Sequence, residues 1–269
     1  MTKKSKTLAL LGTLAVAAAS FLLLDSMYGL TGGFGRVVDG LIAQNVAARG
    51  GADKWRSVDA LRISGHMDLG QGMHVPYTIE QKRPGQMCLE FEFNSEIAIQ
   101  CVTAEGGWKV LPFMGRTRPE RMTEAEYAEM ADAAAIDGLL FDSARRGHKV
   151  SLVGTEMVNG RDAHKLEIVL PRGAKRWLYL DVETSLEVKL ETIRTRNGRQ
   201  QLIETYYSDW REVDGLLIPR LQDSKAQGEP ESHWLTVDSV IVNPAIADER
   251  FAKPALANSG ARSNGSNPS

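Results

Sequence analysis

The sequence predicts a mainly β (α+β) fold, a curved antiparallel half-barrel of about eleven strands with two helical segments lidding its concave face. Apolar and polar residues alternate with a period of two along most of the chain, which is typical of strands with one buried face. Three dipeptides favour the tight turns of β-hairpins: Asn159-Gly160, Asn197-Gly198 and Asp214-Gly215. A large twisted sheet curls, and two helices of ordinary length cannot cover its apolar face. We therefore expect a hydrophobic cavity between the sheet and the helices.

The predicted strands fall into two blocks. The apolar positions of the first block form an antiparallel meander: Leu61, Ile63, Met67 and Leu69; Met73, Val75, Tyr77 and Ile79; Met87, Leu89, Phe91 and Phe93. Those of the second block follow the hairpin dipeptides: Leu166, Ile168 and Leu170; Trp177 and Tyr179; Leu186, Val188 and Leu190; Leu202, Tyr206 and Trp210; His233, Leu235, Val237 and Ile241. Nearly all connections have the short length of hairpin loops, so we expect strands that are consecutive in sequence to pair.

Two segments have helical spacing. Arg36–Arg49 carries one apolar stripe and ends at Gly50-Gly51, which predicts a short amphipathic helix with a glycine stop. The second segment, Thr123–Arg146, separates the two blocks of strands and begins with a capping box formed by Thr123 and Glu126. We expect this segment to act as a lid over the concave face.

The lid segment contains a break. Asp137-Gly138 interrupts the helical pattern and is followed by a short apolar stretch, Leu139-Leu140-Phe141. We call this stretch the apolar knot. Together with Tyr127 and Met130, its side chains are expected to point into the concavity, with Asp137-Gly138 as a hinge.

Composition excludes some classes of protein. The chain has 269 residues, a formal net charge of −2 and a pI near 6.2, so no basic surface for nucleic acid is predicted. His66, Asp68 and His74 fall on the polar face of the first two strands, and no fourth ligand stands at a spacing typical of zinc sites. The sequence also lacks a Gly-x-Ser-x-Gly elbow, a phosphate-binding loop and a His-Glu-x-x-His motif. We expect no cofactor, no metal and no catalytic residue.

The N-terminus predicts export. Lys3, Lys4 and Lys6 precede the uncharged apolar run Thr7–Leu24, which is typical of a targeting segment. Cleavage near Ala17–Ala19 would make it a signal peptide, whereas its length also suits an uncleaved single-pass anchor. The predicted organisation is a signal peptide or anchor at 1–24, a flexible linker at 25–35, one half-barrel domain at 36–253 and a disordered tail at 254–269.

The two cysteines leave two alternatives. In an oxidising compartment Cys88 and Cys101 favour a disulfide, and a two-residue turn at Asn94-Ser95 would place them directly opposite each other. The burial pattern instead requires a one-residue shift of register, which would put Cys88 on the opposite face. We expect the register set by the burial pattern.

Several short motifs resemble the LolA-like superfamily, the outer-membrane lipoprotein-sorting proteins and their half-barrel relatives. They span most of Val37–Phe251: Ala48-Arg49-Gly50-Gly51-Ala52-Asp53-Lys54-Trp55, Leu61-Arg62-Ile63-Ser64-Gly65, Gly106-Gly107-Trp108, Asp137-Gly138-Leu139-Leu140, Gly154–Gly160 and Tyr179-Leu180-Asp181. The resemblance implies an open half-barrel in the periplasm, lidded by helices, with an apolar cavity for acyl chains. It also implies an arginine that locks the lid, for which Arg116, Arg118 and Arg121 are candidates.

The expected function is that of an exported envelope protein, periplasmic or tethered to the inner membrane by Thr7–Leu24, that binds a lipid or the acyl chains of a lipoprotein. The alternative is a membrane-tethered sensor or assembly factor that uses the same fold to bind a protein partner. Enzymatic activity and nucleic-acid binding are not expected. The residues predicted to line the cavity and lid are Phe91, Phe93, Trp108, Phe113, Tyr127, Met130, Leu139, Leu140, Phe141, Trp177 and Tyr206.

Overall fold

The computed structural model describes residues 30–254, except residues 69, 71, 197, 198 and 230. The predicted targeting segment at 1–24 and almost all of the predicted tail at 254–269 lie outside the described residues. In the described part of the chain, no helix is both long and apolar enough to cross a membrane.

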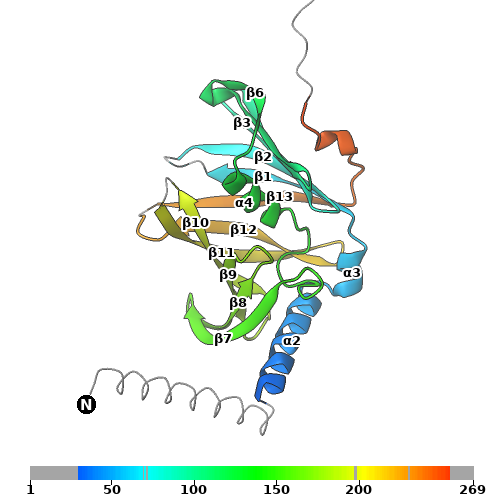
Figure 1. The fold of residues 1–269 in the computed structure, drawn as a ribbon, viewed down its shortest axis with the longest axis vertical. Coiled ribbons are helices and arrows are strands. Elements are labelled where there is room, and N and C mark those ends of the chain that lie inside the picture. The colour runs from blue at the N-terminus through cyan, green and yellow to red at the C-terminus, as the bar shows by residue number, and fades with distance from the viewer. Residues whose placement is uncertain (1–29, 69, 71, 197–198, 230, 255–269) are drawn as a thin grey trace, which may run out of the picture.

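The described residues form one open antiparallel sheet of thirteen strands, which confirms the predicted mainly β half-barrel (Figure 1). The strands are β1 (Ala60–Asp68), β2 (His74–Lys82), β3 (Gln86–Phe93), β4 (Glu96–Thr103), β5 (Gly106–Leu111), β6 (Arg116–Arg121), β7 (Lys149–Val158), β8 (Arg161–Val169), β9 (Lys175–Asp181), β10 (Glu187–Arg196), β11 (Arg199–Val213), β12 (Leu216–Ala226) and β13 (Ser232–Val242). The count exceeds the predicted one partly because β6 has no apolar residue, so alternation cannot reveal it.

The order of strands in the sheet is β6-β5-β4-β3-β2-β1-β13-β12-β11-β10-β9-β8-β7. Every pair is consecutive in sequence except β1 and β13, which join the two meanders. The two edge strands, β6 and β7, are therefore also consecutive in sequence. The connection between them has to cross the sheet from one edge to the other, and it carries α4 (Glu124–Ala133) over the middle of one face (Figure 1). We call that face concave and the other face convex.

The helices differ in length from the prediction. The first, α2 (Leu30–Ala48), begins before residue 36 and ends beside Gly50-Gly51, and the chain then forms the short helix α3 (Ala52–Arg56), which helical spacing over so few residues does not predict. The capping box of Thr123 and Glu126 at the start of α4 is confirmed, and α4 ends at Ala133, shortly before the break predicted at Asp137-Gly138. Turns follow from residue 136 to residue 147, and Gly138 adopts a φ of 81° at the predicted break.

The predicted register of the β3–β4 hairpin, which carries both cysteines, is wrong. Asn94 and Ser95 both have positive φ, as a two-residue hairpin turn requires, and Cys88 lies opposite Cys101 in a disulfide with a Cα–Cα distance of 4.1 Å. The prediction from the burial pattern failed because it assumed that only one face of these strands is buried. Here both faces of the hairpin are buried, and the disulfide lies on the convex one.

The C-terminal segment, residues 243–254 after β13, covers the convex face around that disulfide. Trp108 donates from its indole Nε1 to the carbonyl oxygen of Phe251 at 2.8 Å, and Phe251 is itself almost fully buried. Arg250, in the short 3₁₀ helix η2 (Asp248–Arg250), donates to the carboxylates of Glu80 and Glu90. The first meander is thus packed on both sides.

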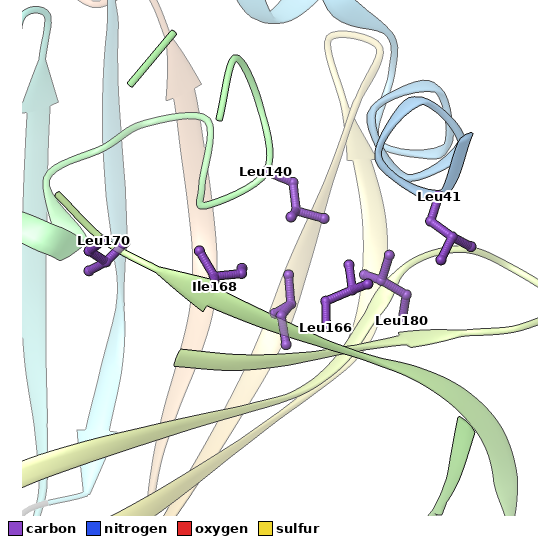
Figure 2. Close-up of a cluster of buried hydrophobic side chains, with 7 residues drawn as sticks. Leu41, Leu140, Leu166, Ile168, Leu170 and Leu180 are labelled. Atoms are coloured by element: carbon purple, nitrogen blue, oxygen red, sulfur yellow. The ribbon is translucent and has the colours of Figure 1, made fainter. Parts of the chain in front are cut away.

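The core of the second meander lies on the concave face. Figure 2 shows Leu140 of the apolar knot pointing toward side chains of β8 and β9, with Leu41 of α2 closing the cluster from the side. Its buried members are Leu41, Leu140, Leu166, Ile168, Leu170, Leu178 and Leu180. The apolar knot and α2 therefore seal one end of the concave face by ordinary core packing.

Candidate functional site: a cavity beneath helix α4

A cavity of about 720 Å³ lies between the concave face and the β6–β7 connection. Strands of both meanders supply its mainly apolar sheet wall, which includes Leu61, Ile63, Ile79, Met87, Leu178 and Ile218. The opposite wall includes small and apolar residues of α4 and the following turns, Ala125, Ala128, Ala133, Ala135, Ile136 and Leu139, beside the acidic Glu129 and Asp132. Sites for small molecules measure roughly 300–1,000 Å³, so this cavity has room for one ligand of that class.

Helix α4 uses different residues to contact the sheet and to line the cavity. Tyr127 and Met130 pack against buried residues that include Met87 and Val102 of β3 and β4, and the Tyr127 hydroxyl donates to the Thr103 carbonyl at 3.0 Å. The residues of α4 that line the cavity recur at helical spacing: Ala125, Ala128, Glu129, Asp132 and Ala133. Helix α4 is thus fixed to the first meander by apolar packing while it presents alanines to the cavity.

Ion pairs connect α4 to the second meander. Arg176 of β9 contacts Asp132 at 2.5 Å, and Arg194 of β10 contacts Glu129. A third and more exposed pair, at 3.2 Å, joins Arg172 and Glu124. All three arginines line the cavity. The side of α4 that faces the second meander is therefore held by polar contacts that solvent reaches.

Three arginines hold the turn before the apolar knot. Arg83 donates to the Asp137 carboxylate at 2.7 Å, Arg49 donates to the Asp137 carbonyl at 3.0 Å, and Arg146 donates to the carbonyl of Gly138. Burial lowers the pKa of Arg146, and the nearby Asp137 carboxylate opposes that shift. None of these residues was among the candidates for a lid-locking arginine, which all lie on β6.

A buried ion pair lies at the wall of the cavity. Arg49 Nη1 is 3.2 Å from Glu187 Oε1, and both side chains line the cavity. The Arg49 guanidinium also lies 4.6 Å from the centre of the Trp55 ring. Burial raises the pKa of the neighbouring Tyr207 phenol, the Glu187 carboxylate raises it further, and Arg49 opposes the shift. Tyr207 therefore stays protonated and can act as a hydrogen-bond donor in the cavity.

Of the residues predicted to line the cavity, all of which the structure describes, only Leu139 does so. Tyr127, Met130, Leu140 and Phe141 pack into the core between the β6–β7 connection and the concave face instead. The lid prediction placed these four residues toward the concavity, and they fill part of it.

The predicted aromatic residues lie elsewhere. Phe91, Phe93 and Phe113 form a separate apolar cluster with Val75 and Tyr77. Trp108 packs on the convex face beside the disulfide, and Trp177 and Tyr206 join another cluster on that face around Tyr179. The convex face buries aromatic side chains too, so size and apolarity did not indicate which face they occupy.

His66 and His74 were the histidines considered as metal ligands on the first two strands. His66 Nδ1 lies 2.8 Å from Asp238 with both side chains half exposed, and His74 stacks on Trp234. Within the described residues, no group of three or more His, Cys, Asp or Glu side chains is arranged to hold a metal ion.

No family model and no curated protein sequence matches the chain. Solved structures do match. A DUF1329 family protein from Desulfovibrio piger superposes with a TM-score of 0.58 and 14% identity, over 80% of this chain and 97% of that protein.

Two further structures extend the comparison. A LolA superfamily protein from Nitrosomonas europaea has a TM-score of 0.56 and 14% identity, over 80% of this chain and 97% of its own. A domain described as that of an outer membrane lipoprotein-sorting protein from Vibrio parahaemolyticus has a TM-score of 0.55 and 16% identity, over 79% and 95%. Identities this low establish the architecture and nothing finer. The chain has the LolA-like fold.

Proposed function

We propose that the protein binds a lipid, or the acyl chains of a lipoprotein, in the cavity beneath α4. The observation that carries this proposal is a cavity of about 720 Å³ whose sheet wall is mainly apolar and whose lid wall is lined by alanines. Burying an acyl chain contributes about 0.8 kcal/mol per methylene and demands no particular geometry. An apolar wall of this kind is therefore sufficient to bind an acyl chain.

The contacts of α4 support a lid that opens on the side of the second meander while it stays attached to the first. The ion pairs from Arg172, Arg176 and Arg194 are partly exposed, and such pairs contribute only about 0.2–1 kcal/mol each. Tyr127 and Met130 keep α4 on the first meander by buried apolar contacts. In this proposal the arginine side of α4 separates first, because its contacts cost less to break.

The proposed location is the periplasm, with Thr7–Leu24 either removed or retained as a tether to the inner membrane. The proposed role is that of a non-enzymatic carrier or sorting protein. Its motivation is the predicted export, together with the LolA-like fold. The alternative role, a tethered sensor or assembly factor that binds a protein partner, stays a prediction from the sequence.

Native mass spectrometry of the full chain, extracted from the envelope and held in amphipol, tests the proposal. Acyl lipids or acylated peptides should leave the protein only on activation in the gas phase. Ala128→Trp places a large side chain in the cavity wall and should reduce the bound fraction. Ala144→Trp, at an exposed position outside that wall, should leave it unchanged. A wild-type protein that carries no acyl species, or equal loads in both variants, would refute acyl binding in this cavity.

A further inference from the structure

A β-bulge turns Glu187 toward the cavity. Glu187 lies opposite Leu180 and Lys189 lies opposite Tyr179, with a shift of register between the two positions on β10. Leu180 belongs to the concave core and Tyr179 to the convex cluster. Simple alternation would put Glu187 on the same face as Lys189 and Glu191, and the bulge moves it to the opposite face. Bulges commonly re-aim a side chain in this way next to functional sites.

Arg49 is held in place from several directions. Gly50 has a φ of 115°, and a Cβ there would lie 2.2 Å from the Gly215 carbonyl oxygen, so only glycine lets the chain pass the β11–β12 turn so closely. The Arg49 carbonyl accepts hydrogen bonds from the Trp55 indole and the Leu217 amide, both at 3.1 Å. The motif that follows α2 thus fixes the backbone of the residue whose guanidinium reaches Glu187.

The ion pair leaves two polar atoms unsatisfied. Arg49 Nε and Glu187 Oε2 are both buried, and neither has a hydrogen-bond partner among the residues that the structure describes. A buried donor or acceptor without a partner is costly, so water or a ligand has to complete both bonds. The two atoms differ in kind, because one donates and the other accepts.

The pair is a poor choice for stability alone. Replacing a buried ion pair by well-packed apolar residues of similar size is often neutral or stabilising. The adjoining wall is already apolar, with Leu178, Leu190 and Ile218. Here a β-bulge and a glycine with positive φ bring a glutamate and an arginine into an apolar wall. This arrangement points to recognition of a ligand.

We propose that Arg49 and Glu187 recognise an uncharged polar head group that both accepts and donates hydrogen bonds, such as the carboxamide or hydroxyl group of an acyl lipid. This inference rests on the proposed lipid-binding function and adds the chemistry of the head group. Arg49 Nε donates to the head group, and Glu187 Oε2 accepts from it. Because the pair is already neutral overall, a charged head group would bring an uncompensated charge into a buried site.

Wild-type selectivity provides the first test. The full chain in amphipol is loaded with the fluorescent apolar probe N-phenylnaphthylamine, which is then displaced by four compounds with the same chain length: palmitamide, hexadecanol, methyl palmitate and palmitate. The first two accept and donate, the ester only accepts, and palmitate is ionised at neutral pH. Palmitamide or hexadecanol should displace the probe at a concentration about tenfold lower than the ester or palmitate, the factor expected for a hydrogen bond to a charged group. A preference for only one of the two assigns the site to that group.

Two variants on the same strand provide the second test. Glu187→Gln leaves the buried Arg49 cation without its counter-charge, so the preference should shift toward palmitate by about tenfold or more. Glu191→Gln is the matched control. Glu191 is also ion-paired, to Lys189 at 2.7 Å, and its side chain is 12% exposed against 11% for Glu187, but it lies on the convex face. Its selectivity should equal that of the wild type.

The outcomes separate the two proposals. Equal displacement by all four compounds in the wild type overturns head-group recognition and leaves acyl binding standing, and this arm needs no variant to fold. A palmitate preference in both variants, or in neither, also overturns it. If none of the compounds displaces the probe and none binds directly, the proposed function and this inference fail together.

Discussion

Breaking the ion pairs of α4 one at a time should loosen the lid in a graded order. The Arg176 and Asp132 side chains are 12% and 35% exposed, those of Arg194 and Glu129 about half exposed, and those of Arg172 and Glu124 are 69% and 86% exposed. Solvent screening weakens exposed pairs most, so Arg176→Gln should have the largest effect and Arg172→Gln almost none.

The magnitude follows from those exposures. Pairs of this kind contribute about 0.2–1 kcal/mol each, and the triple glutamine variant should therefore lose about 1–2 kcal/mol of lid closure. Since 1.4 kcal/mol corresponds to a factor of ten, the open population of α4 should rise roughly tenfold. Raising the salt concentration to about 1 M shortens the screening length and should reproduce part of this effect in the wild type.

Hydrogen–deuterium exchange of the α4 backbone amides measures that population directly. Exchange in α4 should accelerate in the order Arg172→Gln, Arg194→Gln, Arg176→Gln, while exchange in β1 and β13 stays constant. Arg211→Gln, which breaks an exposed pair with Asp209 outside the lid, is the control. Unchanged exchange of α4 in the triple variant would show that these ion pairs do not hold it.

Three further predictions concern stability and are measured by urea unfolding. Replacing both Cys88 and Cys101 by alanine removes a cross-link across a sequence separation of 13 residues and should lower the free energy of unfolding by about 3 kcal/mol; a loss below about 1 kcal/mol would contradict the loop-entropy estimate. Leu140→Ala, at a position 1% exposed, should cost about 3–4 kcal/mol, and a cost near zero would mean that the apolar knot is not part of the core. Burial raises the pKa of Glu80, but hydrogen bonds from arginines outweigh burial and hold this pKa below its ordinary value of 4.5. The ionised Glu80 therefore stabilises the folded state above pH 4.5, and this stabilisation is lost as the pH falls through the folded-state pKa. Glu80→Gln should therefore flatten the decrease in stability below pH 4.5, and an unchanged acid profile would exclude Glu80 as its source.

The fold was predictable because alternation survives wherever one face of a strand is buried. In β1 and β2, residues such as Leu61 and Ile79 face the concave side and their neighbours face outward, so the pattern indicates both strand and face. The prediction failed where the convex face is also covered. The C-terminal segment that buries Cys88 and Trp108 is far away in sequence, and no local pattern shows where it packs.

The candidate site was much harder to predict. Large aromatic residues such as Trp177 and Tyr206 were expected in the cavity, whereas its aromatic members are Trp55, Tyr207 and Trp210, and most of its apolar wall consists of aliphatic residues and alanines that resemble any core. The polar pair was missed for a different reason. Glu187 follows the alternation of a solvated strand face, and only the bulge, which depends on pairing with β9, turns it inward.

The path of the chain from β6 to β7 has a mechanical consequence. The lid is also the covalent link between the two free edges of the sheet, so its contour length limits how far those edges can move apart. A deletion in the turns between the apolar knot and β7 should draw the edges together and favour shorter ligands, while an insertion should admit longer ones. The length of a surface loop can usually change freely. Here the length of the β6–β7 connection would set an upper limit on the size of the ligand.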